Sequence, residues 1–361
     1  MTTNYNIIAC DGGGIRGLIT AMLLNDLVSN PPSGFNSNIL TNVNLYAGTS
    51  TGGIIAIGLA CGLTPSSLVT LYGSDCSSIF QRYQPSAASS LLSRLGLPHL
   101  SLDPCSWVHE LCYVKYSNEG LHNALSNTLT SAHVNPDSPL SQLSTGVLAV
   151  TMMLSNTRND PWGPLALTNL PNSDYANVAI IDAAMCSSAA PLYFPPYAVP
   201  PLPATPTMWC ADGGVVANNP SAFTLAHVLE SQVLQQENKQ LSNVMMLSIG
   251  TGSTIDYIPS MFLSSFVNDW GMLNWLNPIA VPPEPIFPLM AAMFDGQAQI
   301  AHIEAGNILG NSQYQRANPT LTQTINLDDC GAITELESVA NAYIKSTEWA
   351  NIKQWAYKNF V

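Results

Sequence analysis

The N-terminal part of the chain alternates short apolar runs with glycine-rich turns and helical patterns. The runs 5–10 (YNIIAC) and 42–47 (NVNLYA) have the length of strands, and each is followed by a cluster of glycines. Apolar residues then recur at helical spacing over 18–27 and run almost continuously over 54–61. Each unit therefore predicts a strand, a sharp turn and a helix.

The same alternation continues along the rest of the chain. Apolar patterns predict two more strands, at 145–153 and 244–249. They also predict two more helices, at 219–234 and 333–360. Asn219 followed by Pro220 is a strong helix start, because Asn caps a helix and Pro fits its first turn. Apolar strands that alternate with helices are typical of a parallel sheet covered on both faces. We therefore predict a three-layer α/β/α sandwich with a mostly parallel central sheet.

No linker divides the chain, so we expect residues 1–361 to form a single catalytic domain. Two stretches break the alternation: 84–106 is rich in Ser, Leu and Pro, and 257–296 combines prolines with large apolar residues, namely Phe262, Phe266, Trp270, Trp275, Phe287 and Met290. We expect 257–296 to be either an insertion that packs into the core or a lid that contacts an interface.

Composition and charge exclude several classes of partner. The chain is 47% hydrophobic and 9% charged, and its 10 basic and 23 acidic residues give a net charge of −13 with no basic run. Nucleic acid is excluded as a partner, and contact with a membrane would depend on apolar side chains. We expect no transmembrane segment, because no apolar run reaches 18 residues. Since a basic n-region is absent, we expect a cytoplasmic protein or one exported without a cleavable signal peptide.

The cysteines and histidines do not show metal-ligand spacing. The eight cysteines have no C-x-x-C pair, so we expect buried small apolar residues rather than a disulfide framework; they are Cys10, Cys61, Cys76, Cys105, Cys112, Cys186, Cys210 and Cys330. The six histidines form no ligand-spaced pair. We therefore expect neither a metal site nor a metal cofactor.

Gly48-x-Ser50-x-Gly52 matches the nucleophile elbow, in which a strained turn between a strand and a helix lifts a serine hydroxyl clear of the sheet. The predicted strand before Ser50 and helix after it are the context that this pattern requires. The positive end of the helix dipole would also lie at this position. Ser50 is therefore the candidate nucleophile.

The glycine loop 11–17 (DGGGIRG) has two interpretations. Gly12-x-Gly14-x-x-Gly17 fits the dinucleotide fingerprint, but that motif requires an acidic residue about 20 positions later. No Asp or Glu lies between Asp26 and Asp75. Alternatively, the amides of Gly12, Gly13 and Gly14 point at one spot and hold an oxyanion. We favour the oxyanion hole, which needs no cofactor.

A serine nucleophile needs a base, and the sequence offers two kinds. Ser50 and Asp212 with His227 or His302 would satisfy the chain order of an α/β-hydrolase triad. Both histidines, however, fall in helical patterns. Asp212 lies at a glycine turn (Asp212-Gly-Gly) after an apolar, proline-rich stretch, so its carboxylate could be aimed at a neighbouring hydroxyl.

Three motifs occur in order: 11–17 (DGGGIRG), 48–52 (GTSTG) and 212–214 (DGG). Together with 187–195 (SSAAPLYFP), 218–220 (NNP) and 247–252 (LSIGTG), they resemble the patatin-like phospholipase family over about residues 5–320. The resemblance implies a Ser/Asp dyad without a catalytic histidine and hydrolysis of fatty acyl esters of lipids through an acyl-enzyme.

By position, the resemblance makes Ser50 the nucleophile and Asp212 the base, with Gly12, Gly13 and Gly14 supplying the oxyanion amides. Arg16 matches the arginine of the motif, and we interpret it as bracing the loop. Asp11 is expected to shape the turn rather than to react. The expected partner is a lipid or other acyl ester, met at a membrane or micelle interface.

Overall fold

The computed structural model describes residues 4–36, 38–83, 113–158, 160–200, 207–254, 256–260, 263, 271–277 and 287–361. Within these residues one eight-stranded sheet has the order β5-β6-β3-β2-β1-β7-β8, with β4 on the free edge of β3. The strands are β1 Tyr5–Cys10, β2 Leu45–Thr49, β3 Gly146–Asn156, β4 Gly163–Thr168, β5 Tyr197–Val199, β6 Met208–Asp212, β7 Val244–Ile249 and β8 Tyr314–Ala317. The pairs β1–β2, β1–β7, β2–β3 and β7–β8 are parallel, so the predicted mostly parallel sheet is confirmed.

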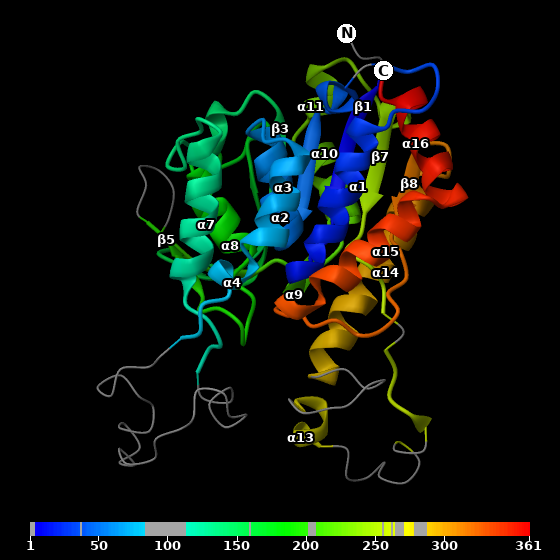
Figure 1. The fold of residues 1–361 in the computed structure, drawn as a ribbon. Helices are drawn as coiled ribbons and strands as arrows, with labels where there is room; N and C mark the ends of the chain where they lie inside the picture. The colour runs from blue at the N-terminus through cyan, green and yellow to red at the C-terminus, as the bar shows by residue number, and fades with distance from the viewer. Residues whose placement is uncertain are drawn as a thin grey trace, which may run out of the picture.

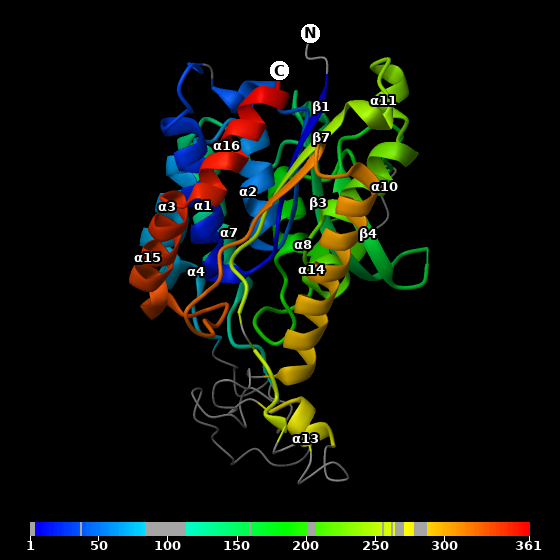
Figure 2. The same ribbon diagram turned by 90° about the vertical axis from the view of Figure 1, so that its right-hand side faces the viewer.

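Helices cover both faces of the sheet, as Figure 2 shows. One face packs against α1 Gly17–Ser29, α2 Thr51–Ala60, α3 Pro65–Ser74, α4 Cys76–Ile79, α7 Asn118–Ser131, α8 Ile180–Ser187, α15 Ile333–Ile344 and α16 Thr347–Asn359. The other packs against α10 Ser221–Glu230, α11 Val233–Gln236 and α14 Pro288–Leu309. Because β1 is buried on both faces, its side chains point alternately into the two cores. Ile8 and Cys10 pack on the side of α1 and α2, whereas Ile7 and Ala9 pack on the side of α10 and α14. The predicted three-layer sandwich is confirmed (Figure 1).

The long strand β3 brings two other strands end to end. Its first half pairs with β2 in parallel, up to the pair Thr49 and Val150. Its second half pairs with the antiparallel strand β6, beginning at the pair Thr151 and Asp212. Because β4 occupies the opposite edge of β3, β2 and β6 share one edge and end at the same level. Ser50, which follows Thr49, and Asp212 are therefore brought together by strand register.

Two predicted helices are each divided in the structure. The pattern over 333–360 forms α15 and α16, because Ser346 caps a new helix: its hydroxyl accepts a hydrogen bond from the amide of Trp349 at 3.1 Å. The pattern over 219–234 forms α10 and α11, separated at Gln232, which has a φ of 60°. The predicted cap is shifted by one residue: Pro220 rather than Asn219 occupies the N-cap position of α10, and the Asn219 side chain accepts from the amide of Ser221 at 2.9 Å.

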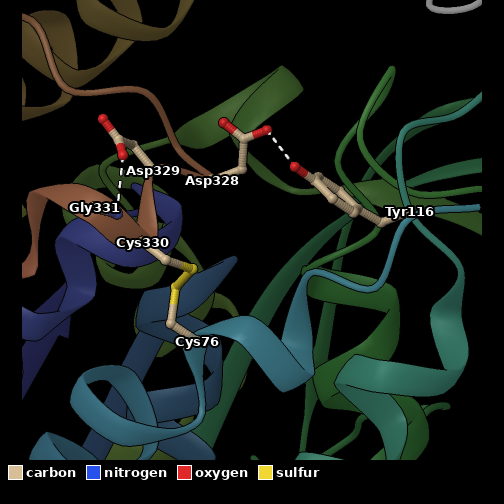
Figure 3. The surroundings of a disulfide bond; sticks show 6 residues. All are labelled: Cys76, Tyr116, Asp328, Asp329, Cys330 and Gly331. Carbon is tan, nitrogen blue, oxygen red and sulfur yellow. Dashed lines mark hydrogen bonds between the residues drawn. A yellow bond between two sulfur atoms is a disulfide. The ribbon is translucent and has the colours of Figure 1, made fainter. Parts of the chain in front are cut away.

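Cys76 and Cys330 form a disulfide, with a Cα–Cα distance of 5.8 Å across a sequence separation of 254 residues (Figure 3). The expectation that the cysteines are unpaired apolar residues was therefore wrong for this pair. Both members lie at the ends of short helical segments that the fold brings together, which their spacing does not reveal. Cys10, Cys61, Cys186 and Cys210 are free, and Cys105 and Cys112 lie outside the described residues.

Two predicted features fall wholly or partly outside the described residues. The stretch 84–106 lies entirely outside them, as do Phe262, Phe266 and Trp270 of the stretch 257–296. The described part of 257–296 contains α13 Met272–Trp275 and the first turns of α14. Within the part of the chain that the structure describes, no helix combines the length and apolarity needed to cross a bilayer.

Candidate active site

Ser50 lies in a strained turn between β2 and α2. Its φ of 55° and ψ of −123° fall in a region that residues with a side chain rarely adopt. The flanking glycines permit this turn: a Cβ at position 48 would lie 1.9 Å from the carbonyl oxygen of Gly52, and one at position 52 would lie 2.0 Å from that of Cys10. The G-x-S-x-G spacing is therefore a steric requirement of the turn, as predicted from the elbow pattern.

A second serine holds the turn in place from α8. The hydroxyl of Ser187 accepts a hydrogen bond from the amide of Ser50 at 2.9 Å and donates to the carbonyl of Val150 at 2.7 Å. Ser187 is fully buried, so this hydroxyl is a fixed link between the elbow and β3. The position of Ser50 thus depends on three segments rather than on its own turn alone.

Asp212 ends β6 beside Ser50. The Ser50 hydroxyl is within hydrogen-bonding reach of its carboxylate, and the amide of Gly214 donates to Oδ1 at 2.6 Å. Burial raises the pKa of Asp212 to about 6, although the hydrogen bonds from Ser50 and Gly214 lower it. Near neutral pH this carboxylate is mostly ionised, and it is a better base than an exposed aspartate.

The glycine loop packs beside the elbow with its amides in different roles. The amide of Gly12 donates to the carbonyl of Asn218 at 2.9 Å, and that of Ile15 donates to the carbonyl of Leu327 at 2.8 Å. Among the described residues, no hydrogen bond occupies the amides of Gly13 and Gly14. A Cβ at Gly12 would lie 3.3 Å from the Cβ of Ser50, so the loop comes close to the elbow.

Both charged residues of the glycine loop are engaged with the protein. Arg16 donates from Nε to the carbonyl of Gly13 at 3.4 Å. The buried Asp11 carboxylate forms an ion pair with Arg316 of β8 at 2.5 Å. Burial raises the pKa of Asp11, while Arg316 lowers it. Asp11 therefore ties the loop to the far edge of the sheet.

An apolar pocket opens beside Ser50. Besides Ser50, Thr51 and Gly14, its walls consist mainly of large apolar and aromatic side chains, namely Ile15, Ile54, Leu71, Tyr72, Ile79, Phe80, Leu121, Leu125, Tyr193, Phe194 and Leu327. A second cavity adjoins it at Tyr193 and Leu327 and is also lined by Arg16. Polar residues surround a larger third cavity of about 630 Å³, which shares Arg16 and Asp295 with the second. The site is thus apolar on one side of the glycine loop and polar on the other.

The two histidines considered as triad members lie elsewhere. His227 on α10 contacts the ring of Phe223 and lies 3.5 Å from Glu230. His302 on α14 contacts the hydroxyl of Tyr314 at 3.1 Å. Within the described residues, neither histidine has a hydrogen bond to Ser50 or Asp212.

Sequence reasoning assigned no role to several residues that hold the site. Ser187, Asn218 and Thr251 each lie in a block that resembles the family, and each bonds to the elbow or the glycine loop; Thr251 donates to the carbonyl of Gly12 at 2.8 Å. Arg316 and Leu327 lie in no such block. Only the fold brings them to the glycine loop, so no local signal could have identified them.

Comparisons with known proteins identify the family of this chain. The patatin-like phospholipase family profile matches residues 8–223. A cGAMP-activated phospholipase of Vibrio cholerae is 30% identical over 283 residues, which cover 75% of this chain and 72% of that protein. Patatin-like protein 2 of Arabidopsis thaliana is 29% identical over 291 residues, covering 75% of this chain and 65% of that protein. Protein teg of Priestia megaterium is 25% identical over 354 residues, covering 94% of this chain and 95% of that protein.

The matched region contains the elbow, the glycine loop and Asp212, and it defines the class of the protein as a serine acyl hydrolase. Within that class, the chain belongs to the patatin-like phospholipase family. The resemblance seen in its motifs is therefore confirmed.

Proposed function

We propose that the protein hydrolyses acyl esters of lipids with Ser50 as the nucleophile and Asp212 as its base. One observation supports this most strongly: the Ser50 hydroxyl lies within hydrogen-bonding reach of a buried carboxylate whose pKa is raised to about 6, beside an apolar pocket. A buried carboxylate of this kind can accept a proton near neutral pH. The neighbouring pocket suits a fatty acyl chain.

The reaction would proceed through an acyl-enzyme. Asp212 accepts the Ser50 proton as Oγ attacks the ester carbonyl carbon, and the carbonyl oxygen becomes an oxyanion. When the intermediate collapses, the bond to the leaving alkoxide breaks and Asp212 returns the proton to it. Water then attacks the acyl-enzyme and gives a proton to Asp212. When this second intermediate collapses, the bond between Oγ and the acyl carbon breaks, Asp212 returns the proton to Oγ, and the fatty acid leaves.

The amides of Gly13 and Gly14 are the proposed oxyanion donors, because neither has a partner within the described residues. The amide of Gly12 is already bonded to Asn218, so we assign Gly12 a steric role. Arg16 braces the loop through the carbonyl of Gly13. Thus the set of three amides expected from the sequence is narrowed to two.

Release of fatty acid tests this proposal. Ser50→Ala and Asp212→Asn are each expected to reduce hydrolysis of a p-nitrophenyl ester and of a phospholipid at least about 10³-fold. Ser338→Ala, which removes an exposed hydroxyl on α15, is the matched control and should leave both rates unchanged. If either active-site variant kept the rate of the unmodified protein, the proposed dyad would be wrong.

We further propose that the outward face of α14 contacts the lipid interface. Leu289, Met293, Ile300 and Ile303 lie on one side of this helix and are 40–58% exposed. The other side of α14 lines the cavities next to the site through Phe294 and Asp295. A bilayer on the apolar face would therefore meet the enzyme beside its cleft, without the basic residues that anionic lipids attract.

Vesicle assays distinguish this surface from a contact between subunits. Met293→Asp and Ile300→Asp should each lower hydrolysis of phosphatidylcholine vesicles about ten-fold, with hydrolysis of a soluble ester unchanged. Val361→Asp alters an equally exposed apolar residue at the opposite end of the molecule and serves as the control. A changed oligomeric state in the α14 variants would instead identify a subunit contact and refute interfacial docking.

A further inference from the structure

Two segments far apart in the sequence each contribute a wall to the apolar pocket. Ile79 of α4 and the adjacent Phe80 line it from one segment. Leu327, which lies between β8 and α15, lines it from the other. The Cys76–Cys330 disulfide joins the beginning of α4 to the segment that carries Leu327 (Figure 3). The covalent bond therefore connects the two walls just outside the pocket.

The wall at Leu327 also supports the glycine loop. The carbonyl of Leu327 accepts a hydrogen bond from the amide of Ile15 at 2.8 Å. Gly14, which has a φ of 56°, lies so close that a Cβ there would be 2.2 Å from the same carbonyl oxygen. A displacement of Leu327 would consequently change both the pocket and the loop beside Ser50.

A hydrogen-bond contact accompanies the disulfide. Asp328 accepts from the hydroxyl of Tyr116 at 2.7 Å (Figure 3). Its carboxylate also lies 3.4 Å from the Nζ of Lys115. The ring of Tyr116 in turn contacts those of Phe80 and Phe194, with centroids 5.1 and 5.8 Å apart. Tyr116 thus reaches from the Leu327 segment to aromatic residues of the pocket wall.

We propose that the Cys76–Cys330 disulfide determines acyl selectivity by fixing the separation of these two walls. The free space in the pocket is small, about 50 Å³, so the room for an acyl chain depends on how far these two segments can separate. A branched acid is wider than a straight acid of the same carbon number, so a fixed separation disfavours the branched acid more. Hydrogen bonds and ring contacts can yield to a bulky substrate, whereas a covalent link between backbones 5.8 Å apart cannot. This inference rests on the proposed function only in placing the acyl chain in this pocket.

Opening the link tests the proposal. Cys76→Ser, Cys330→Ser and the double variant are compared on p-nitrophenyl octanoate and on the p-nitrophenyl ester of a branched acid with the same carbon number. The preference in kcat/KM for the straight ester is expected to fall about ten-fold, and to the same extent in all three variants, since each removes the same bond. Cys61→Ser removes a free, half-buried cysteine and is the matched control.

A chemical opening provides a second route to the same state. Dithiothreitol transfers two electrons and two protons to the disulfide, giving two thiols, and closes to its own cyclic disulfide. Treatment of the unmodified protein with dithiothreitol should lower the preference for the straight ester as the substitutions do. The same treatment of the variants should leave their preference unchanged. Alkylation followed by mass spectrometry of the intact protein counts the two new thiols. Tyr116→Phe, which removes the hydrogen bond to Asp328 and keeps the disulfide, should lower the preference by a smaller factor.

Binding of a fluorescent straight-chain fatty acid, displaced by straight or branched acids, separates this inference from the proposed chemistry. The open variants should lose discrimination in displacement as well as in turnover. One outcome is that the unmodified protein turns over no ester while the open variants still lose discrimination between straight and branched acids in displacement. In that case the proposed function fails and this inference stands. An unchanged preference in protein shown to lack the bridge would overturn the inference.

Discussion

Asp212→Asn should raise the stability of the protein at neutral pH while abolishing its activity. The substitution keeps the shape of the side chain and an oxygen that can accept from Gly214, but it removes a buried charge. A pKa raised from 3.8 to about 6 means that the folded protein binds this proton more tightly than the unfolded chain does. The stability that this group contributes is present below the unfolded pKa and is lost as the pH rises through about 6.

The magnitude follows from the shift. Between about pH 4.5 and pH 7.5, titration of Asp212 with these two pKa values lowers the free energy of unfolding by about 2 kcal/mol. The difference in stability between Asp212→Asn and the unmodified protein should therefore increase by about that amount over this range. Other titrating groups contribute equally to both proteins, so they cancel in the difference.

Urea unfolding followed by circular dichroism at both pH values measures this difference. The urea midpoint of Asp212→Asn should exceed that of the unmodified protein by an amount that grows with pH. This result would agree with a buried carboxylate of raised pKa. A difference that stays constant from acid to neutral pH would refute the argument, because it would show that the carboxylate titrates alike in the folded and unfolded states.

Other consequences concern the pH profile, the elbow, the loop and the disulfide. The kcat/KM of a soluble ester should rise with pH through about 6 and then level off, because Asp212 must be ionised; an acid limb near pH 4 would contradict the raised pKa. Ser187→Ala should lower kcat about ten-fold with little change in KM, since the Ser50 amide loses its acceptor; equal changes in both constants would argue against a positioning role. Gly14→Ala should destabilise the protein by at least about 2 kcal/mol in urea unfolding, because its Cβ would collide with Leu327. Cys330→Ser should lower the free energy of unfolding by about 2–4 kcal/mol; an unchanged urea midpoint would show that the bridge adds no stability.

The central strands and the elbow were predictable because their signals are local. The bounds of β1 and β7 match the expected runs, and a buried parallel strand is apolar at nearly every position. Gly48 and Gly52 flank Ser50 at positions where a side chain would collide with the backbone, so the G-x-S-x-G spacing marks the turn. Strand and turn chemistry of this kind depends on neighbours in the sequence, so it can be read without the fold.

The rest of the site depends on contacts that only the fold creates. Asp212 lies level with Ser50 because β6 meets β2 end to end along β3, an arrangement that neither strand encodes by itself. The strand β6 follows a proline-rich stretch and was not predicted. Likewise, the pairing of Cys76 with Cys330 joins residues 254 positions apart. Spacing cannot reveal a pairing that depends on where two helical segments pack.

Mass spectrometry after reaction with a fluorophosphonate tests the central claim most directly, because this reagent forms a covalent adduct with an activated serine. One adduct per chain is predicted, located on the peptide that contains Ser50 and formed far more slowly in Asp212→Asn. An adduct on another residue, or labelling of Ser50 at the same rate without the carboxylate at position 212, would contradict the proposed dyad.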